Sequence, residues 1–262
     1  MATNKVLTER RGRTWLVTIN RPEKRNCVDA DVAQGLFEAA EEFKRDDSLD
    51  VLVLTGAGDR AFCAGADLTQ IPALNGREGA FSSGPMGISR LTDVEKPTIA
   101  AVEGYSTAGG LELACWCDFR IASTTAQFGV LNRRWGVPLV DGGTQKLPQI
   151  VGMGNAMYLI ITGALINADH ALRMGLAQEV VPAGQALTRA LAIAETLSTY
   201  PQPAMRADKQ AAIHAFRLEP DEGLSFEVQA HRESNRDPAM AQWLERFAKG
   251  ERPTPITPPP AP

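Results

Sequence analysis

Residues 97–123 read PTIAAVEGYSTAGGLELACWCDFRIAS, and this stretch decides how the chain folds. Residues 98–102 are a short run of β-branched and small apolar residues that ends in the turn signal Glu103-Gly104, which predicts a buried strand. The glycine pair Gly109-Gly110 then opens a predicted helix. The first N–H groups of a helix have no partner inside it, and the helix dipole favours negative charge there. This junction therefore predicts a site for an anion, or for an oxygen that becomes anionic during a reaction.

Glu112 lies in the first turn of this predicted helix, among the apolar residues Leu111, Leu113, Ala114 and Trp116. A glutamate at this position can simply complement the helix dipole, which is worth about 0.3–1 kcal/mol. A carboxylate in such an apolar segment is rarely buried unless it is paired or functional. Glu112 is therefore a candidate acid/base residue, with dipole complementation as the alternative.

A second predicted strand, residues 51–54, also runs into a glycine-rich loop. The loop spans residues 55–68 and consists largely of small residues, which let the backbone approach a ligand closely. The sequence thus predicts two strands that end in loops suited to binding.

Several motifs occur in a fixed order along the chain: AFCAGADL at 61–68, VEGYSTAGGLELACWCD at 102–118, AQFG at 126–129 and GGTQKLPQIVG at 142–152. Together with Ile19-Asn20-Arg21-Pro22-Glu23 they resemble the enoyl-CoA hydratase/isomerase (crotonase) superfamily over roughly residues 14–180. The resemblance implies an α/β fold, the crotonase-like (ClpP/crotonase) spiral of repeated ββα units with a C-terminal helical region. It also implies assembly into a homotrimer or a hexamer built as a dimer of trimers.

The resemblance implies a site for the thioester of an acyl-CoA. By similarity, the backbone N–H groups of Ala66 and Gly109 form an oxyanion hole for the thioester carbonyl, and Glu112 is one of the two glutamates of a hydratase. Polarising that carbonyl makes Cβ of an α,β-double bond electrophilic and the α-proton acidic, so the reaction needs no metal and no cofactor beyond the coenzyme A of the substrate. The resemblance also places the backbone of five residues near the nucleotide and pantetheine portions of coenzyme A: Arg25, Cys27, Ala64, Asp67 and Leu68.

The sequence departs from the hydratase pattern at Asn132, which stands where hydratases carry their second glutamate. Asparagine cannot exchange a proton at neutral pH, so Asn132 is retained as a substrate-binding candidate only. Asp141 is the nearest carboxylate by sequence, although an ungapped alignment places the catalytic aspartate of some isomerase relatives on Val140. Asp141-Gly142 is also a turn dipeptide, which gives the aspartate a purely structural alternative. We predict Glu112 as the principal acid/base residue and Asp141 as its partner.

These residues favour an enoyl-CoA hydratase-like enzyme that reversibly hydrates 2-enoyl-CoA thioesters in fatty-acid or related acyl-CoA metabolism. Because one carboxylate can move a proton between two carbons, an enoyl-CoA isomerase or another enolate-forming reaction is the alternative within the family. Asn132 also leaves open a non-catalytic acyl-CoA-binding protein. The variable segment 69–90 is expected to shape the acyl pocket.

Two motifs point to other classes of enzyme. Residues 104–108, GYSTA, nearly match the nucleophile elbow of serine hydrolases, but the three histidines, His170, His214 and His231, have no distinguishing context. Residues 56–61, GAGDRA, resemble a dinucleotide-binding loop, but the long helix that such a site requires does not follow. Both matches are weak.

The composition sets the frame for this site. The chain has 262 residues, of which 44% are hydrophobic, and a formal net charge of −4, which gives no electrostatic case for binding nucleic acid. No apolar run approaches the roughly 20 residues needed to cross a bilayer, so membrane insertion is not expected. The four cysteines lack Cys-x-x-Cys spacing, which suggests reduced thiols and neither a zinc site nor a disulfide framework. We therefore expect a cytoplasmic protein.

The organisation of the chain changes near residue 200. Before it, strands are predicted at 14–20, 51–54, 98–102 and 119–122, and helices at 29–45, 142–159, 167–174 and 185–200. After it only helical patterns remain, at 203–217, 221–235 and 238–248. We therefore predict a crotonase-like α/β core over 1–200, a helical oligomerisation region over 201–252 and a proline-rich, disordered tail over 253–262.

Overall fold

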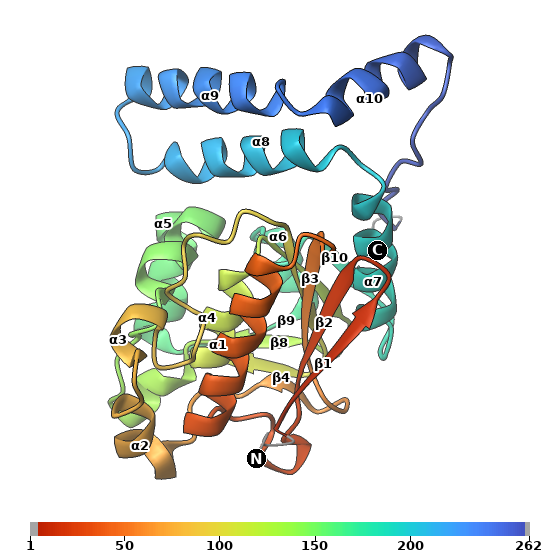
Figure 1. Cartoon of the computed structure of the whole chain (residues 1–262). Helices are drawn as coiled ribbons and strands as arrows, with labels where there is room; N and C mark the ends of the chain where they lie inside the picture. The colour runs from red at the N-terminus through yellow and green to blue at the C-terminus, as the bar shows by residue number, and fades with distance from the viewer. Residues whose placement is uncertain (1–4, 260–262) are drawn as a thin grey trace.

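The computed structural model describes residues 5–259, and its strands form two sheets (Figure 1). The larger sheet has the order β1 (Val6–Arg11), β2 (Thr14–Ile19), β3 (Val51–Gly56), β5 (Thr98–Val102), β7 (Phe119–Ser123) and β10 (Glu179–Val181). All of its neighbours are parallel except the antiparallel pair β1 and β2. The smaller sheet has the order β4 (Ala61–Cys63), β6 (Tyr105–Thr107), β8 (Gln127–Gly129) and β9 (Leu165–Asn167).

Three successive units give one strand to each sheet. β3 is followed by β4, β5 by β6, and β7 by β8, with the first strand in the larger sheet and the second in the smaller one. The second unit continues into α4 (Gly109–Trp116), and the third into η3 (Leu131–Trp135) and α5 (Gly143–Thr162). The expected spiral of repeated ββα units is therefore confirmed. Stacking the units brings the loops after β4, β6 and β8 to one side of the smaller sheet.

Helices cover both faces of the larger sheet. α1 (Ala30–Arg45) begins at Asp29, whose carboxylate accepts a hydrogen bond from the N–H of Val32 at 3.0 Å, and it buries Leu36 and Phe43 in the main core. α7 (Ala186–Ser198) packs on the opposite face, where Ile193 joins a second core with residues of β2, β3, β5 and β7. This layering explains why β3 and β5 are buried throughout.

The remaining core helices are short. α2 (Ile71–Asn75) and α3 (Ala80–Ser83) follow η2 (Leu68–Gln70), η1 (Pro22–Lys24) precedes α1, and α6 (Ala168–Arg173) lies between β9 and β10. The sequence predicted β2, β3, β5 and β7 but missed the others, because β4, β6, β8, β9 and β10 have three residues each, too few to show alternation. β1 was missed because all of its residues except Val6 are exposed and three are charged.

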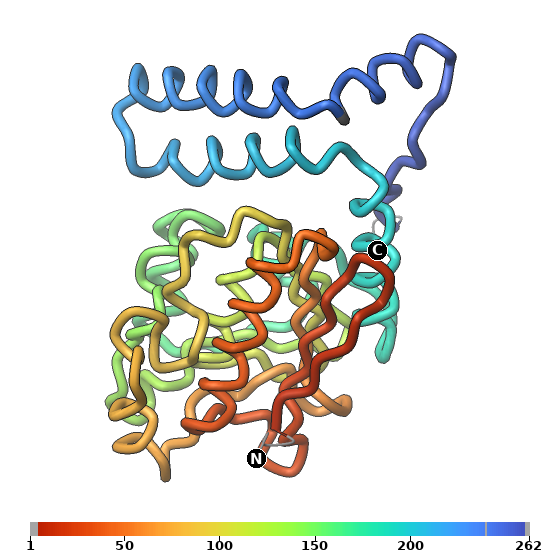
Figure 2. Tube along the Cα trace, in the orientation of Figure 1, coloured from red at the N-terminus to blue at the C-terminus, as the bar shows by residue number. Residues whose placement is uncertain are grey.

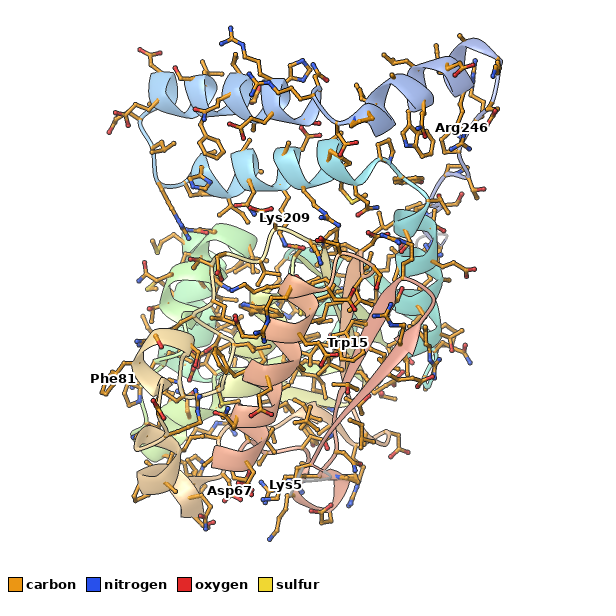
Figure 3. The ribbon with its side chains drawn as sticks, viewed as in Figure 1. Lys5, Trp15, Asp67, Phe81, Lys209 and Arg246 are labelled. Carbon is orange, nitrogen blue, oxygen red and sulfur yellow. The ribbon has the colours of Figure 1, made fainter. Side chains whose placement is uncertain are left out.

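Three C-terminal helices form a separate layer, called here the helical arm and defined as residues 202–248. α8 (Gln202–His214), α9 (Pro220–Ser234) and α10 (Pro238–Ala248) lie beyond the core, with α8 on its core side (Figures 1 and 2). Lys209 lies on the core side of α8 (Figure 3). It forms an ion pair with Asp118 at 2.9 Å, and Arg206 forms one with Asp50 at 3.3 Å. The last core helix, α7, ends at Ser198, and α8 begins at Gln202.

The chain beyond the arm returns to the core. Residues 253–259 contain neither helix nor strand, yet they run beside α7 instead of leaving the molecule. The Tyr200 hydroxyl donates to the carbonyl of Thr254 at 2.7 Å, and Arg189 donates to that of Thr257 at 2.8 Å. Ile256 packs on the second core. The expectation of a disordered tail is wrong for this segment, because side chains of α7 and its C-terminal end hold its backbone; residues 260–262 lie outside the described residues.

Candidate active site

One cavity of about 990 Å³ collects the candidate residues that the sequence indicated. Its walls come from η1, the loop after β4, segment 68–90, the start of α4 and the loop that follows η3. All ten predicted site residues line it: Arg25, Cys27, Ala64, Ala66, Asp67, Leu68, Gly109, Glu112, Asn132 and Asp141. Residues separated by more than 100 positions in sequence therefore face one volume.

Two unpaired backbone N–H groups lie next to each other in this cavity. Gly65 and Ala108, the residues that precede Ala66 and Gly109, both have positive φ, at 107° and 53°. A Cβ built on Gly65 would lie 3.3 Å from the nitrogen of Gly109, so the two loops approach within contact distance. Within residues 5–259, neither the Ala66 nor the Gly109 N–H donates to a protein acceptor. Two such donors can stabilise an oxygen that gains negative charge.

The left-handed backbone of Ala108 is strained, because a residue with a side chain costs about 1–3 kcal/mol in such a conformation. Hydrogen bonds on both sides hold it. The Ala108 N–H donates to the carbonyl of Gly129 at 2.9 Å, and its carbonyl accepts from Leu111 and Glu112 at 3.0 and 3.2 Å. This strained residue lies beside the site and leaves the Gly109 N–H free.

Gly110 allows the helix to pack directly on the smaller sheet. A Cβ at this position would lie 1.9 Å from the carbonyl oxygen of Cys63 in β4. Only glycine fits such an approach. The second glycine of the predicted pair therefore fixes the distance between the Ala66 and Gly109 loops, while the first contributes its N–H.

Glu112 is a buried carboxyl group, 3% exposed, that faces the cavity. Its Oε1 accepts hydrogen bonds from the backbone N–H groups of Asp141 at 2.9 Å and Gly143 at 2.8 Å. Burial, and after it the neighbouring charge of Asp141, raise its pKa to about 7, while the N–H groups of Gly143 and Asp141 act in the opposite direction. A group with this pKa can both take up and release a proton near neutral pH. Dipole complementation alone does not account for this burial.

Asp141 is the second buried carboxyl group, 4% exposed. Its Oδ1 accepts a hydrogen bond from the N–H of Met86 at 2.9 Å and another from the hydroxyl of Ser89. Burial raises its pKa, opposed by the Ser89 and Met86 hydrogen bonds and then by the charge of Arg90. These partners come from a distant segment, so the aspartate does more than form the turn at Gly142.

Asn132 is buried beside the same cavity, 9% exposed, in η3. Its side-chain N–H donates to the carbonyl of Val137 at 2.9 Å. Its Oδ1 is buried and, in the part of the chain that the structure describes, accepts no hydrogen bond. Carboxylates therefore stand at 112 and 141, with a neutral amide at 132.

The end of the cavity formed by the residues after η1 and the loop after β4 carries the residues expected to contact coenzyme A. The Ala64 N–H donates to the carbonyl of Arg25 at 3.0 Å, and the Asp67 N–H donates to that of Val28 at 2.8 Å, which fixes the backbone of this loop. Lys24 and Arg25 place positive charge at this end. Burial raises the pKa of Cys27, so its thiol is not an activated nucleophile.

Three further residues position the site but gave no sequence signal. Asn26 is fully buried, accepts from the N–H of Arg21 at 3.0 Å and donates to the carbonyl of Ala61 at 2.6 Å, which joins two loops of the cavity. Met86 and Ser89 hold Asp141, as described above. All three lie in irregular segments, where no periodic pattern marks a buried residue.

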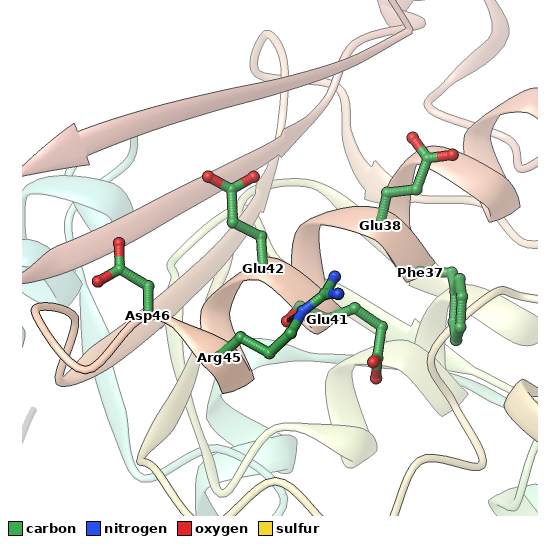
Figure 4. A pocket seen from close by; sticks show the side chains of 6 residues that line it. All are labelled: Phe37, Glu38, Glu41, Glu42, Arg45 and Asp46. Atoms are coloured by element: carbon green, nitrogen blue, oxygen red, sulfur yellow. Dashed lines mark hydrogen bonds between the residues drawn. The ribbon is translucent and has the colours of Figure 1, made fainter.

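The geometry does not support a serine hydrolase, and the other features outside the cavity do not form a second site. Ser106, the serine of the near-match to a nucleophile elbow, is fully buried and donates to the carbonyl of Gly110 at 3.2 Å. A second hollow on α1 is lined by Phe37, Glu38, Glu41, Glu42, Arg45 and Asp46 from one helix and its C-cap, and Figure 4 shows these side chains spreading along the helix. Among the described residues, no cluster of histidine, cysteine or carboxylate side chains is arranged to hold a metal, and no helix is long and apolar enough to span a membrane.

Comparisons with known proteins identify the family of the chain. The family model for enoyl-CoA hydratase/isomerase matches residues 9–252. A short-chain-enoyl-CoA hydratase of Clostridium acetobutylicum is 37% identical over 94% of this chain and 97% of its own length. A crotonyl-CoA hydratase of Syntrophomonas wolfei is 37% identical over 88% of this chain and 89% of its own. The crystal structure of an enoyl-CoA hydratase from Mycobacterium tuberculosis superimposes with a TM-score of 0.90 at 32% identity, covering 96% of this chain and 98% of that one. The chain therefore belongs to the enoyl-CoA hydratase/isomerase family of the crotonase superfamily.

Proposed function

We propose that this protein catalyses the reversible hydration of 2-enoyl-CoA thioesters. The observation that carries the proposal is the convergence of two unpaired backbone N–H groups and two buried carboxyl groups on one cavity. The curated relatives described above are named as hydratases of short acyl-CoA thioesters.

The oxyanion hole acts on the thioester carbonyl. In the proposed complex, the carbonyl oxygen accepts from the N–H groups of Ala66 and Gly109, which draws electron density from Cβ. When water adds at Cβ, the negative charge moves onto that oxygen, where two preorganised donors stabilise it. Removing one donor of this kind typically costs about 3 kcal/mol of transition-state stabilisation.

The two carboxyl groups divide the proton transfers. The Ser89 hydroxyl and the Met86 N–H donate hydrogen bonds to Asp141 and favour its ionised form, whereas the pKa of Glu112 is raised to about 7. We therefore assign the ionised form to Asp141 and the protonated form to Glu112, because two adjacent buried carboxyls do not both ionise readily. Asp141 takes one proton from water, the hydroxide oxygen bonds to Cβ, and Glu112 gives its proton to Cα. A proton passes from Asp141 back to Glu112 through solvent, which restores the enzyme.

Coenzyme A is part of the substrate in this proposal, and no separate cofactor takes part. The backbone around Arg25, Cys27, Ala64, Asp67 and Leu68 lies at the end proposed to contact the pantetheine and nucleotide. The acyl group extends toward apolar side chains of segment 69–90 and the loop after η3, among them Leu74, Met86 and Val137. The size of this part of the cavity sets the acyl chain that fits.

A panel of acyl-CoA thioesters followed by mass spectrometry tests the proposal. Crotonyl-CoA is expected to gain the mass of one water, and Asp141→Asn is expected to lower kcat about 100-fold because it removes the base. Conversion of a 3-enoyl to a 2-enoyl thioester without a change of mass, and without hydration of crotonyl-CoA, would replace the proposal with an isomerase. Binding without turnover of any thioester would leave an acyl-CoA-binding protein.

We also propose that the chain assembles into a homotrimer or a hexamer in the cytoplasm. The helical arm exposes large apolar side chains that the single chain leaves unpartnered: Phe216, Leu224, Val228, Leu244 and Phe247. Exposed apolar patches on this scale favour association. Four unpaired cysteines suit a reducing compartment. Light scattering of the purified chain and imaging of a tagged chain test these two points.

A further inference from the structure

The unpartnered oxygen of Asn132 is the feature of the cavity that the proposed acid–base pair does not use. A buried acceptor without a donor lowers stability, and nearly all buried acceptors in proteins have one. The orientation of this amide is settled by its neighbour, because only the Nδ2 side can donate to the carbonyl of Val137 at 2.9 Å. Oδ1 is therefore the atom without a partner.

Because Asn132 lines the cavity, a molecule bound there is the candidate donor for its Oδ1. No N–H or O–H group among residues 5–259 reaches this oxygen. The loop from η3 to Asp141 carries both this amide and the proposed base along one wall. The Val137 N–H also donates to the Asn132 carbonyl at 3.2 Å, so the amide is held from both its backbone and its side chain.

A nucleophilic water needs two acceptors. One acceptor takes the proton that leaves, and a second must hold the other proton if a lone pair is to point at Cβ. An amide oxygen suits the second task, because it accepts a hydrogen bond but cannot remove the proton. A third carboxylate here would add charge beside two buried carboxyls and raise their pKa values further.

We propose that Asn132 is a positioning residue that holds the attacking water through its Oδ1 while Asp141 removes the other proton. This inference rests on the proposed hydration. The water gives one proton to Asp141 and forms the C–O bond, and the O–H that Asn132 has held becomes the hydroxyl hydrogen of the product. Glu112 and the two backbone N–H groups act on Cα and the carbonyl, and do not depend on this amide.

Two reactions of the same site separate this role from a structural one. Hydration of crotonyl-CoA needs the positioned water, whereas exchange of the α-protons of butyryl-CoA with D₂O needs only the oxyanion hole and Glu112. The test compares the wild type with Asn132→Leu, which is similar in size and lacks the acceptor. The control is Asn155→Leu, since Asn155 also donates to a backbone carbonyl, that of Val151 at 2.9 Å, but lies outside the cavity lining.

Asn132→Leu is expected to lower kcat for hydration about 10–100-fold, the cost of a misplaced nucleophile, with KM changed less than about 3-fold. Its α-proton exchange should stay within about 3-fold of the wild type, as should both reactions of Asn155→Leu. A parallel loss of hydration and exchange, or no loss of hydration, would overturn the role of Asn132. If the wild type exchanges α-protons but hydrates no 2-enoyl thioester, the proposed function fails and the inference fails with it.

Discussion

The cavity wall and the helical arm use their side chains in opposite ways. Around the cavity, two carboxyls and an amide are buried, and backbone groups hold them at fixed distances. In the arm, α8 and α9 bury no residue, and large apolar side chains such as Leu224 are exposed. The polar groups around the cavity are therefore buried within the chain, whereas the large apolar side chains of the arm are exposed.

This difference indicates where the chain tolerates change. Near the cavity, an added methyl group would overlap backbone atoms at Gly110 and the carboxyl of Glu112 at Gly143. In α9, a methyl group added to Gly223 would meet nothing within 4 Å. Substitutions in the core should therefore act on activity and folding, and those in the arm on assembly.

The largest effect is expected from Glu112→Gln. The substitution keeps the shape and an acceptor for the N–H groups of Asp141 and Gly143 but removes the proton donor, so kcat for hydration should fall about 1,000-fold. Acyl-CoA affinity and oligomeric state should not change, because the arm is untouched. Steady-state kinetics, calorimetric titration and light scattering check the three quantities. Wild-type activity in this variant would remove Glu112 from the mechanism.

Gly110→Ala and Gly223→Ala compare the two regions with the same chemical change. In Gly110→Ala, the new Cβ overlaps the Cys63 carbonyl, so the free energy of unfolding should fall by about 3 kcal/mol or more. In Gly223→Ala, the alanine favours the helix, and that free energy should rise by about 0.5–1 kcal/mol. Urea denaturation measures both. Equal effects would show that the arm is packed as tightly as the cavity wall.

The raised pKa of Glu112 predicts that the site costs stability at neutral pH. Below pH 4.5 the carboxyl is protonated in both states; between 4.5 and its folded pKa of about 7, only the unfolded chain ionises. The contribution of this group is therefore fully present below pH 4.5 and lost as pH rises to 7, a change of about 3 kcal/mol. The free energy of unfolding of Glu112→Gln minus that of the wild type should therefore be about 3 kcal/mol higher at pH 8 than at pH 4.5. Parallel stability curves in urea would contradict the shift.

The sequence indicated the candidate catalytic residues but not the residues that hold them in place. Gly109 and Glu112 stand in a strand–helix junction that sequence patterns reveal, the family motifs added Ala66, and Asp141 was predicted as the nearest carboxylate by sequence. The partners of Asp141 could not be predicted, because Met86 and Ser89 precede it by more than 50 positions and lie in an irregular segment. Only the folded chain shows which loops meet.

The fold shows the same division. The helix α1 and the strand β5 were predicted nearly to the residue, α1 because its buried face gives the sequence a helical period and β5 because it is a short apolar run that ends at a turn signal. The strands of the smaller sheet were missed because three residues carry no period. The path of residues 253–259 was missed because proline-rich composition excludes a helix but does not exclude docking through backbone carbonyls.

The smallest effect concerns the attachment of the arm to the core. Lys209 donates to the carbonyl of Lys96 at 2.8 Å and to Asp118 at 2.9 Å, and it is part of the link between α8 and the core. Because such partly exposed pairs are worth about 0.5–1 kcal/mol, Lys209→Met should speed hydrogen exchange in α8 by roughly 2- to 5-fold and leave the amides of β3 and β5 unchanged. Lys249→Met is the control, since Lys249 follows the last residue of the arm and pairs with Glu245 of α10, where both side chains are exposed. If hydrogen exchange in β3 rises together with that in α8, the arm and the core open as one unit. The two regions would then differ in side-chain burial but not in local stability.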